Sequence, residues 1–85
     1  MLKDKVIMIS GVGPGLGRRM AIGAAKMGAK ISLACRTQSY LDELSKEVKN
    51  LGAEVISVKT DISDPDQTQN FVDETVKVFG TVDAL

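Results

Sequence analysis

Eight residues near the start of the chain carry the clearest chemical signal. Residues 10–17 read Ser-Gly-Val-Gly-Pro-Gly-Leu-Gly, after an apolar run at residues 6–9 and before a stretch rich in alanine. Glycines let a backbone approach an anion closely, and the start of a helix offers unpaired N–H groups and the positive end of its dipole. A strand, a glycine loop and a helix in this order are typical of phosphate binding.

The spacing of these glycines shows which of the known nucleotide-binding loop patterns the sequence fits. The pattern G-x-G-x-x-G fails in every register, and G-x-x-x-x-G-K-[ST] fails because no Gly-Lys pair follows. The glycines at positions 11, 15 and 17 do fit G-x-x-x-G-x-G. With a serine in front, the stretch resembles the Thr-Gly-x-x-x-Gly-x-Gly signature of the short-chain dehydrogenase/reductase family. The resemblance implies a cofactor loop made by Ser10, Gly11, Gly13, Pro14, Gly15, Leu16 and Gly17.

The residues that follow the second predicted strand indicate which nucleotide binds. In dinucleotide-binding βαβ units, an acid about 20 residues past the glycines bonds the ribose 2′-hydroxyl. Here that place holds Cys35, which does not repel a 2′-phosphate, and then Arg36 and Thr37, which can donate to one. In the family, Arg directly after that position marks a preference for NADP(H), so we expect NADP(H) ahead of NAD(H). The plainer alternatives are a solvated Arg36 and a Cys35 that is a small buried side chain.

Two further places in the sequence could contact the cofactor. Asp61 follows the third predicted strand, at the sheet edge where ligands bind. The resemblance implies that Asp61 contacts the adenine amino group and that the backbone of Ile62 lies along the ring. The alternative is an Asp that stabilises the loop. Arg18 and Arg19 open the first helix, where a cation is disfavoured unless an anion sits there; a phosphate and plain solvation explain them equally well.

The elements that must position these residues alternate regularly. Apolar runs predict strands at residues 5–9, 30–35, 54–59 and 81–85, and helical periodicity predicts three helices between them. This βαβαβαβ order predicts an α/β fold, a Rossmann-like doubly wound parallel sheet that is only partly present, with the fourth strand beside the first. Residues 1–85 are then the N-terminal part of a single dinucleotide-binding domain.

Each predicted helix has an expected buried face and expected ends. The first helix, residues 18–27, is expected to pack through small residues that include Gly23 and Ala25. Ser39 and Asp64 are the expected N-caps of the second and third helices, and glycines end all three. The expected core-facing residues are Met20, Ala21, Ala24 and Met27 in the first helix, Leu41, Leu44, Val48 and Leu51 in the second, and Phe71, Val72, Thr75, Val76 and Phe79 in the third.

Composition excludes several function classes. Equal numbers of acidic and basic residues leave no electrostatic footprint for nucleic acid or an anionic membrane. A single Cys and no His exclude an internal disulfide, a Cys-rich metal site and His-based catalysis. The first apolar run is too short to span a bilayer and lacks the cleavage site of a signal peptide. The expectation is a cytoplasmic protein that binds neither metal, membrane nor nucleic acid.

The family's catalytic residues are not expected in this sequence. The resemblance covers the whole chain but only the family's N-terminal half, so the catalytic Ser and the Tyr-x-x-x-Lys pair would lie beyond Leu85. Tyr40 has Leu44 and not Lys four residues on, and is expected to pack or cap near the second helix. In the intact family member, a small carbonyl or alcohol substrate reacts by hydride transfer with the nicotinamide cofactor. The helices that form the family's dimer are also missing here, so a homo-oligomer remains an open expectation.

Two other classes stay open from the residues. A methyltransferase would use Gly11-Val-Gly-Pro-Gly15 as G-x-G-x-G, but Ile9 and Cys35 stand where its acids usually lie. A non-enzymatic nucleotide-binding module would be complete at this length, with a bare strand edge that a partner could cover. Nucleotide preference separates the methyltransferase from the reductase, and turnover of a carbonyl substrate separates the module from it.

Overall fold

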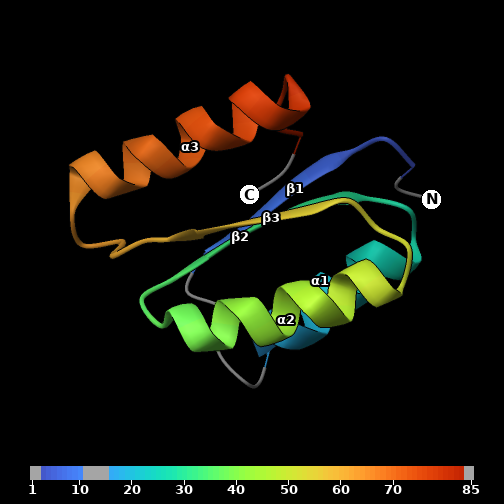
Figure 1. The fold of residues 1–85 in the computed structure, drawn as a ribbon. Helices are drawn as coiled ribbons and strands as arrows, with labels where there is room; N and C mark the ends of the chain where they lie inside the picture. The colour runs from blue at the N-terminus through green and yellow to red at the C-terminus, as the bar shows by residue number, and fades with distance from the viewer. Residues whose placement is uncertain (1–2, 11–15, 84–85) are drawn as a thin grey trace.

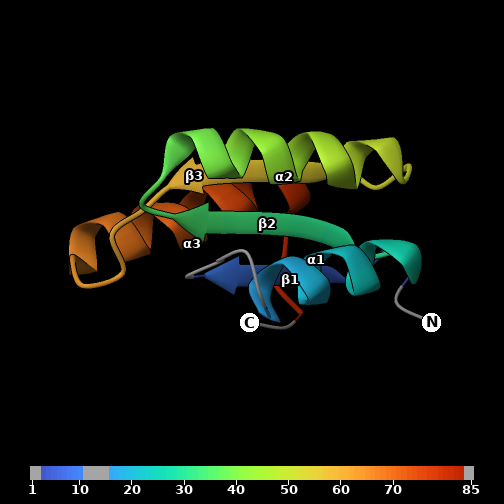
Figure 2. The same cartoon turned by 90° about the horizontal axis from the view of Figure 1, so that it is seen from below.

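A computed structural model describes residues 3–10 and 16–83 as a three-stranded sheet between helices. The elements are β1 (Val6–Ser10), α1 (Leu16–Lys26), β2 (Lys30–Cys35), α2 (Gln38–Asn50), β3 (Val55–Lys59) and α3 (Pro65–Phe79). The strands are parallel in the order β1-β2-β3. Helices α1 and α2 lie side by side on one face of the sheet and α3 covers the other (Figures 1 and 2). The predicted α/β fold with a parallel sheet is confirmed.

The two faces of the sheet carry unequal cores. Alternate residues of a strand point to opposite faces. On the α1–α2 face, Ile31 and Leu33 of β2 pack among ten buried residues, with Leu41, Leu44 and Val48 of α2. On the α3 face the buried apolar cluster is Met8, Ala34 and Phe71.

A buried hydrogen-bond chain supplements that thinner core. The Ser32 and Thr75 hydroxyls, both fully buried, lie 2.7 Å apart, and Thr75 Oγ1 donates to the Phe71 carbonyl at 2.8 Å. Because a carbonyl only accepts, the Thr75 proton is committed to Phe71 and Ser32 is the donor to Thr75. This chain joins the middle strand to α3.

The helix ends follow the sequence in α3 and depart from it in α2. Asp64 caps α3, its Oδ1 accepting from the N–H groups of Asp66 and Gln67, and Gly80 ends the helix at φ 83°. The expected Ser39 cap is wrong: α2 begins at Gln38 and its N-cap is Thr37, whose side chain makes no capping hydrogen bond. The side-chain amide of Gln38 donates to Asp42 one turn later, and α2 begins two residues earlier than a Ser39 cap would place it.

Helix α1 packs on the sheet chiefly through alanines, with the half-buried Ile22 beside them. Ala21 and Ala25 are buried, whereas Met20 and Met27 are about half exposed, so the expectation that these methionines face the core is wrong. Gly23 is exposed as well, and a Cβ there would meet nothing within 4 Å. The helix approaches the sheet closely along its alanine stripe, which turns the bulky methionines outward.

Other expected core positions also lie at the surface. Leu51 and Val76 are both more than two fifths exposed, because they stand at the ends of the buried faces of α2 and α3. Phe71 and Thr75 are buried, while Val72 and Phe79 are half-buried.

The predicted fourth strand is not formed over residues 81–83. The segment nevertheless lies beside β1, as expected, since the Asp83 N–H donates to the Val6 carbonyl at 2.9 Å. The Asp83 carboxylate accepts the Val6 N–H at 2.9 Å, in the place where a strand carbonyl would accept it. The remainder of the predicted strand, residues 84–85, is outside the described residues.

Candidate functional site

The predicted cofactor residues gather at one edge of the sheet. Ser10, Cys35 and Lys59 are the last residues of β1, β2 and β3, and their registers place these ends level with one another. Arg36 and Asp61 therefore leave the sheet at the same carboxyl edge. In open parallel sheets, ligands bind outside this edge.

The glycine loop joins β1 to α1 at this edge. Ser10 is exposed, and Gly17 lies in the first turn of α1, which begins at Leu16. That first turn carries no acidic residue, so no carboxylate of its own competes for an incoming anion. The predicted contacts Gly11, Gly13, Pro14 and Gly15 lie outside the described residues.

The start of α2 is open toward an anion. Cys35 is 7% exposed, and its thiol donates to the Thr37 carbonyl at 3.4 Å, so the plain expectation of a small buried side chain is confirmed. Arg36 and Thr37 are exposed. The first turn of α2 contains no acidic residue, and the side chain of its N-cap residue, Thr37, makes no capping hydrogen bond. The start of α2 and the exposed Arg36 therefore lie next to each other at the end of β2.

Asp61 organises the loop that follows β3. Its Oδ1 accepts hydrogen bonds from the Ser63 N–H at 3.0 Å and the Ser63 hydroxyl at 2.6 Å. Its own N–H donates to Gln67 in the first turn of α3. The two Ser63 bonds hold the pKa of Asp61 below its usual range, and Arg36 adds a smaller effect in the same direction. The loop-stabilising role is thus present, and the exposed Ile62 stands beside it.

Arg18 pairs with a carboxylate of the protein, whereas the sequence left a phosphate and plain solvation open for it. Its Nε donates to Glu47 Oε2 at 3.2 Å and its Nη2 to Glu47 Oε1, a bidentate pair between α1 and α2. Tyr40 packs against the α1–α2 core close to this pair, as expected for that residue. Burial raises the pKa of the Tyr40 hydroxyl, and the Arg18 charge opposes the rise.

Sequence reasoning missed two features of this edge. Glu47 was not singled out, although an arginine in the first turn of a helix requires an anion and α2 offers carboxylates on its flank. The uncapped start of α2 was hidden by Ser39, which has the residue type of a cap but lies inside the helix.

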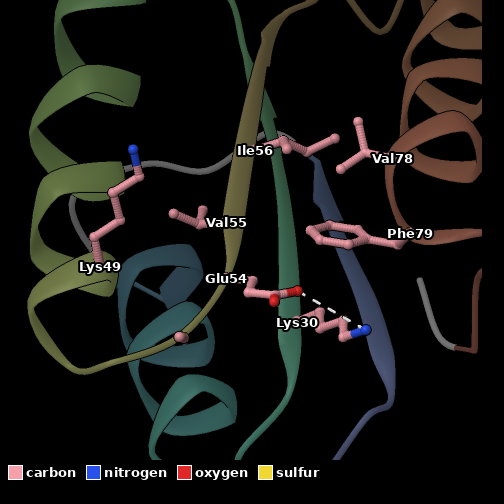
Figure 3. Close-up of a pocket in the computed structure, with 8 residues that line it drawn as sticks. Lys30, Lys49, Glu54, Val55, Ile56, Val78 and Phe79 are labelled. Carbon is pink, nitrogen blue, oxygen red and sulfur yellow. Dashed lines mark ion pairs between the residues drawn. The ribbon is translucent and has the colours of Figure 1, made fainter.

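A hollow of about 520 Å³ lies at the opposite edge of the sheet (Figure 3). It is found at the amino ends of β2 and β3, and Ile56, Val78 and Phe79 line one side of it. Lys30 Nζ is 3.8 Å from Glu54 Oε2 and 6.0 Å from the centre of the Phe79 ring, so its charge is already engaged. This hollow is separate from the predicted cofactor edge.

The described part of the chain lacks two other kinds of feature. Residues 3–10 and 16–83 contain no group of three His, Cys, Asp or Glu side chains placed to hold a metal ion. No helix in the same ranges is long and apolar enough to cross a membrane.

Known proteins similar to this chain form one group. The sequence model for short chain dehydrogenases matches residues 5–85. L-rhamnose 1-dehydrogenase (NAD(P)(+)) of a Sphingomonas strain is 35% identical over an alignment that covers all of this chain and 34% of that protein. Plant 11-beta-hydroxysteroid dehydrogenase 1A, from Arabidopsis thaliana, is 35% identical over 99% of this chain and 24% of its own length.

Solved structures give the same result. Levodione reductase is 35% identical and superposes with a TM-score of 0.92 over 98% of this chain and 33% of its own. A short chain dehydrogenase/reductase from Burkholderia phymatum in complex with NAD is 37% identical, with a TM-score of 0.91 over 95% of this chain and 29% of its own. The chain spans about a third of the length of these relatives.

Proposed function

Because the chain belongs to the short-chain dehydrogenase family, we propose that the intact protein is an NADP(H)-dependent oxidoreductase. It interconverts a carbonyl and an alcohol by hydride transfer, and residues 1–85 are the N-terminal part of its single dinucleotide-binding domain. The dehydrogenases and reductases among the relatives support this reaction class, and the NAD-bound neighbours support a nicotinamide dinucleotide site.

The start of α2 carries the choice of NADP(H). Arg36 is exposed directly after β2, next to helix N–H groups that no side chain caps. The family of sites that prefers NAD(H) places an acid at the end of this strand, and here the residue is the neutral, buried Cys35. A 2′-phosphate at this point would receive charge-assisted bonds from Arg36 and a hydroxyl contact from Thr37, with no carboxylate at the strand end to repel it.

The remaining cofactor contacts follow from the same edge. The first turn of α1, with Leu16 and Gly17, receives the pyrophosphate in this proposal, together with Ser10 and the loop glycines Gly11, Gly13 and Gly15 and Pro14. Asp61 keeps a carboxylate oxygen, Oδ2, that can accept from the adenine amino group while Oδ1 holds Ser63. The Ile62 backbone lies along the adenine ring.

This chain's part in the reaction is to bind and orient the cofactor. When bound, the nicotinamide supplies or accepts the hydride. The acid–base group that handles the substrate proton belongs to the rest of the intact protein, as do the contacts that select the substrate. A cytoplasmic location and self-association of the intact protein complete the proposal. The methyltransferase alternative is not favoured, because Cys35 stands where that class has the acid that bonds the ribose of its cofactor, and the family match is to short chain dehydrogenases.

Replacement of Arg36 by glutamate tests this proposal. Arg36→Glu removes the 2′-phosphate donor and adds a repelling charge that can accept from a free 2′-hydroxyl. We expect NADPH affinity to fall about 10- to 100-fold, as for the loss of charge-assisted bonds of about 1.5–3 kcal/mol. NADH affinity should hold or rise. Dissociation constants measured by titration of the intact protein give both numbers.

The matched control makes the same charge change elsewhere on the same helix. Lys46 is exposed on α2, away from its start, and Lys46→Glu should leave both affinities unchanged. Equal NADPH affinity in Arg36→Glu and the wild-type protein would remove Arg36 from the site.

A further inference from the structure

The Arg18–Glu47 pair joins the two helices whose starts form the proposed site. Arg18 lies in the first turn of α1, one residue after Gly17, so it is attached directly to the glycine loop. Glu47 lies on α2, the helix that begins right after Arg36 and Thr37. Both side chains of the pair are about two fifths exposed, which leaves half of each packed between the helices.

The bidentate contact fixes the relative orientation of the Arg18 guanidinium and the Glu47 carboxylate as well as the distance between them. A guanidinium that donates through Nε and Nη2 to both oxygens of one carboxylate holds the two planes together, which a single contact would not do. The alanines and leucines of the buried cluster on this face make non-directional contacts, which do not select one orientation of the two side chains. The pair therefore sets how far the first turn of α1 stands from α2.

We propose that Arg18 and Glu47 are positioning residues that set the spacing between the pyrophosphate subsite and the 2′-phosphate subsite. A whole dinucleotide must reach both helix starts at once, so its affinity depends on that spacing. The affinity of a ligand that occupies only the start of α2 does not depend on that spacing. Glu47 also satisfies the Arg18 charge, which frees the first turn of α1 from an unpaired cation and keeps Arg18 itself off the phosphates. This inference rests on the proposed function, because it assigns a role to each end of the same site.

The test compares a ligand that spans both subsites with one that fills a single subsite. NADPH spans both, and adenosine 2′-phosphate reaches only the α2 start. In the intact protein, Glu47→Gln and Arg18→Gln should each weaken NADPH about fivefold, which is about 1 kcal/mol at 1.4 kcal/mol per tenfold. Adenosine 2′-phosphate should bind each variant as it binds the wild-type protein. The double variant should be no weaker than either single one, since the two groups act as a unit.

Two matched variants sharpen the test. Glu43→Gln removes a carboxylate one turn away on the same helix and should leave NADPH affinity unchanged. Arg18→Lys keeps the positive charge but loses the two-donor geometry of the guanidinium, so this variant should bind NADPH as weakly as Arg18→Gln. Thermal unfolding of each variant establishes that it is folded under the conditions of the titration.

Each other outcome counts against a definite part of the account. Equal losses for both ligands would mean that the pair only stabilises the fold. Tighter NADPH binding in Glu47→Gln would make Arg18 a phosphate ligand that Glu47 restrains, and full recovery in Arg18→Lys would reduce the pair to simple charge; either result overturns the positioning role. A wild-type protein that binds neither ligand would overturn the proposed function and the inference together. One that binds both, with unchanged variants, would overturn the inference alone.

Discussion

Residues at the ends of β2 and β3 lie at the proposed cofactor site, and two of them also make structural contacts. Asp61 holds Ser63 through one carboxylate oxygen, and this contact lowers its pKa, so the side chain remains an acceptor well into mild acid. Cys35 is tied to the Thr37 carbonyl beneath the place assigned to the ribose. Arg36 is exposed, so its replacement should affect cofactor binding and little else.

The thiol of Cys35 gives a residue-level measurement of occupancy. It is the only Cys of the chain and lies directly before Arg36. Bound NADPH should shield it, so alkylation should slow about tenfold when NADPH is present at about ten times its dissociation constant. Mass spectrometry of the peptide that contains Cys35 follows the rate. At the same NADPH concentration, Arg36→Glu should lose the protection and Lys46→Glu should keep it. An alkylation rate of Cys35 that is unchanged by saturating NADPH would mean that the ribose binds elsewhere.

At the scale of elements, the helix starts differ in a way that matches the proposed site. The start of α3 is closed by Asp64, which accepts from two helix N–H groups, and it also carries the acidic Asp66. The starts of α1 and α2 have no acid in the first turn, and both face the carboxyl edge. The proposal assigns no anion to the start of α3, which Asp64 already caps. It assigns phosphates to the starts of α1 and α2, which lack acids.

The attachment of α3 depends on the hydroxyl chain from Ser32 through Thr75 to Phe71. Thr75→Val should cost about 1–3 kcal/mol of unfolding free energy, because it leaves the Ser32 O–H buried without an acceptor. Ser32→Ala should cost less, since Thr75 keeps its bond to the Phe71 carbonyl. Denaturant midpoints at constant m-value give these differences. The double variant should recover part of the Thr75→Val loss, and Thr81→Val, at an exposed position, is the neutral control. Equal costs for the two single changes would contradict the assigned direction of donation.

How far the sequence predicts each element depends on how local its cause is. The Asp64 cap and the Gly80 end of α3 follow from neighbouring residues alone and are confirmed. The buried face of α1 depends on how closely the helix approaches the sheet, a tertiary quantity, so Met20 and Met27 were misplaced. The Arg18–Glu47 pair joins residues 29 positions apart, and no local pattern reveals that contact. The edge at which Arg36 and Asp61 meet was predictable because parallel strands all end there.

For the whole molecule, the cofactor edge and the opposite edge of the sheet have different characters. The carboxyl edge carries two helix starts without acids in their first turns and an exposed arginine, whereas Lys30 in the opposite hollow is engaged with Glu54 and Phe79. With no net charge on the chain, binding of an anionic cofactor must come from this local arrangement and not from a general positive potential. The chain covers about a quarter to a third of the length of the relatives described above, and the segment through Asp83 lies along β1.

Titration of the intact protein with NADPH and with NADH tests the central claim most directly. The account predicts that NADPH binds at least about tenfold more tightly, because the 2′-phosphate adds charge-assisted bonds with Arg36 and the α2 start worth at least about 1.4 kcal/mol. Binding of NADH as tight as that of NADPH, or tighter, would contradict the assignment of the α2 start to the 2′-phosphate.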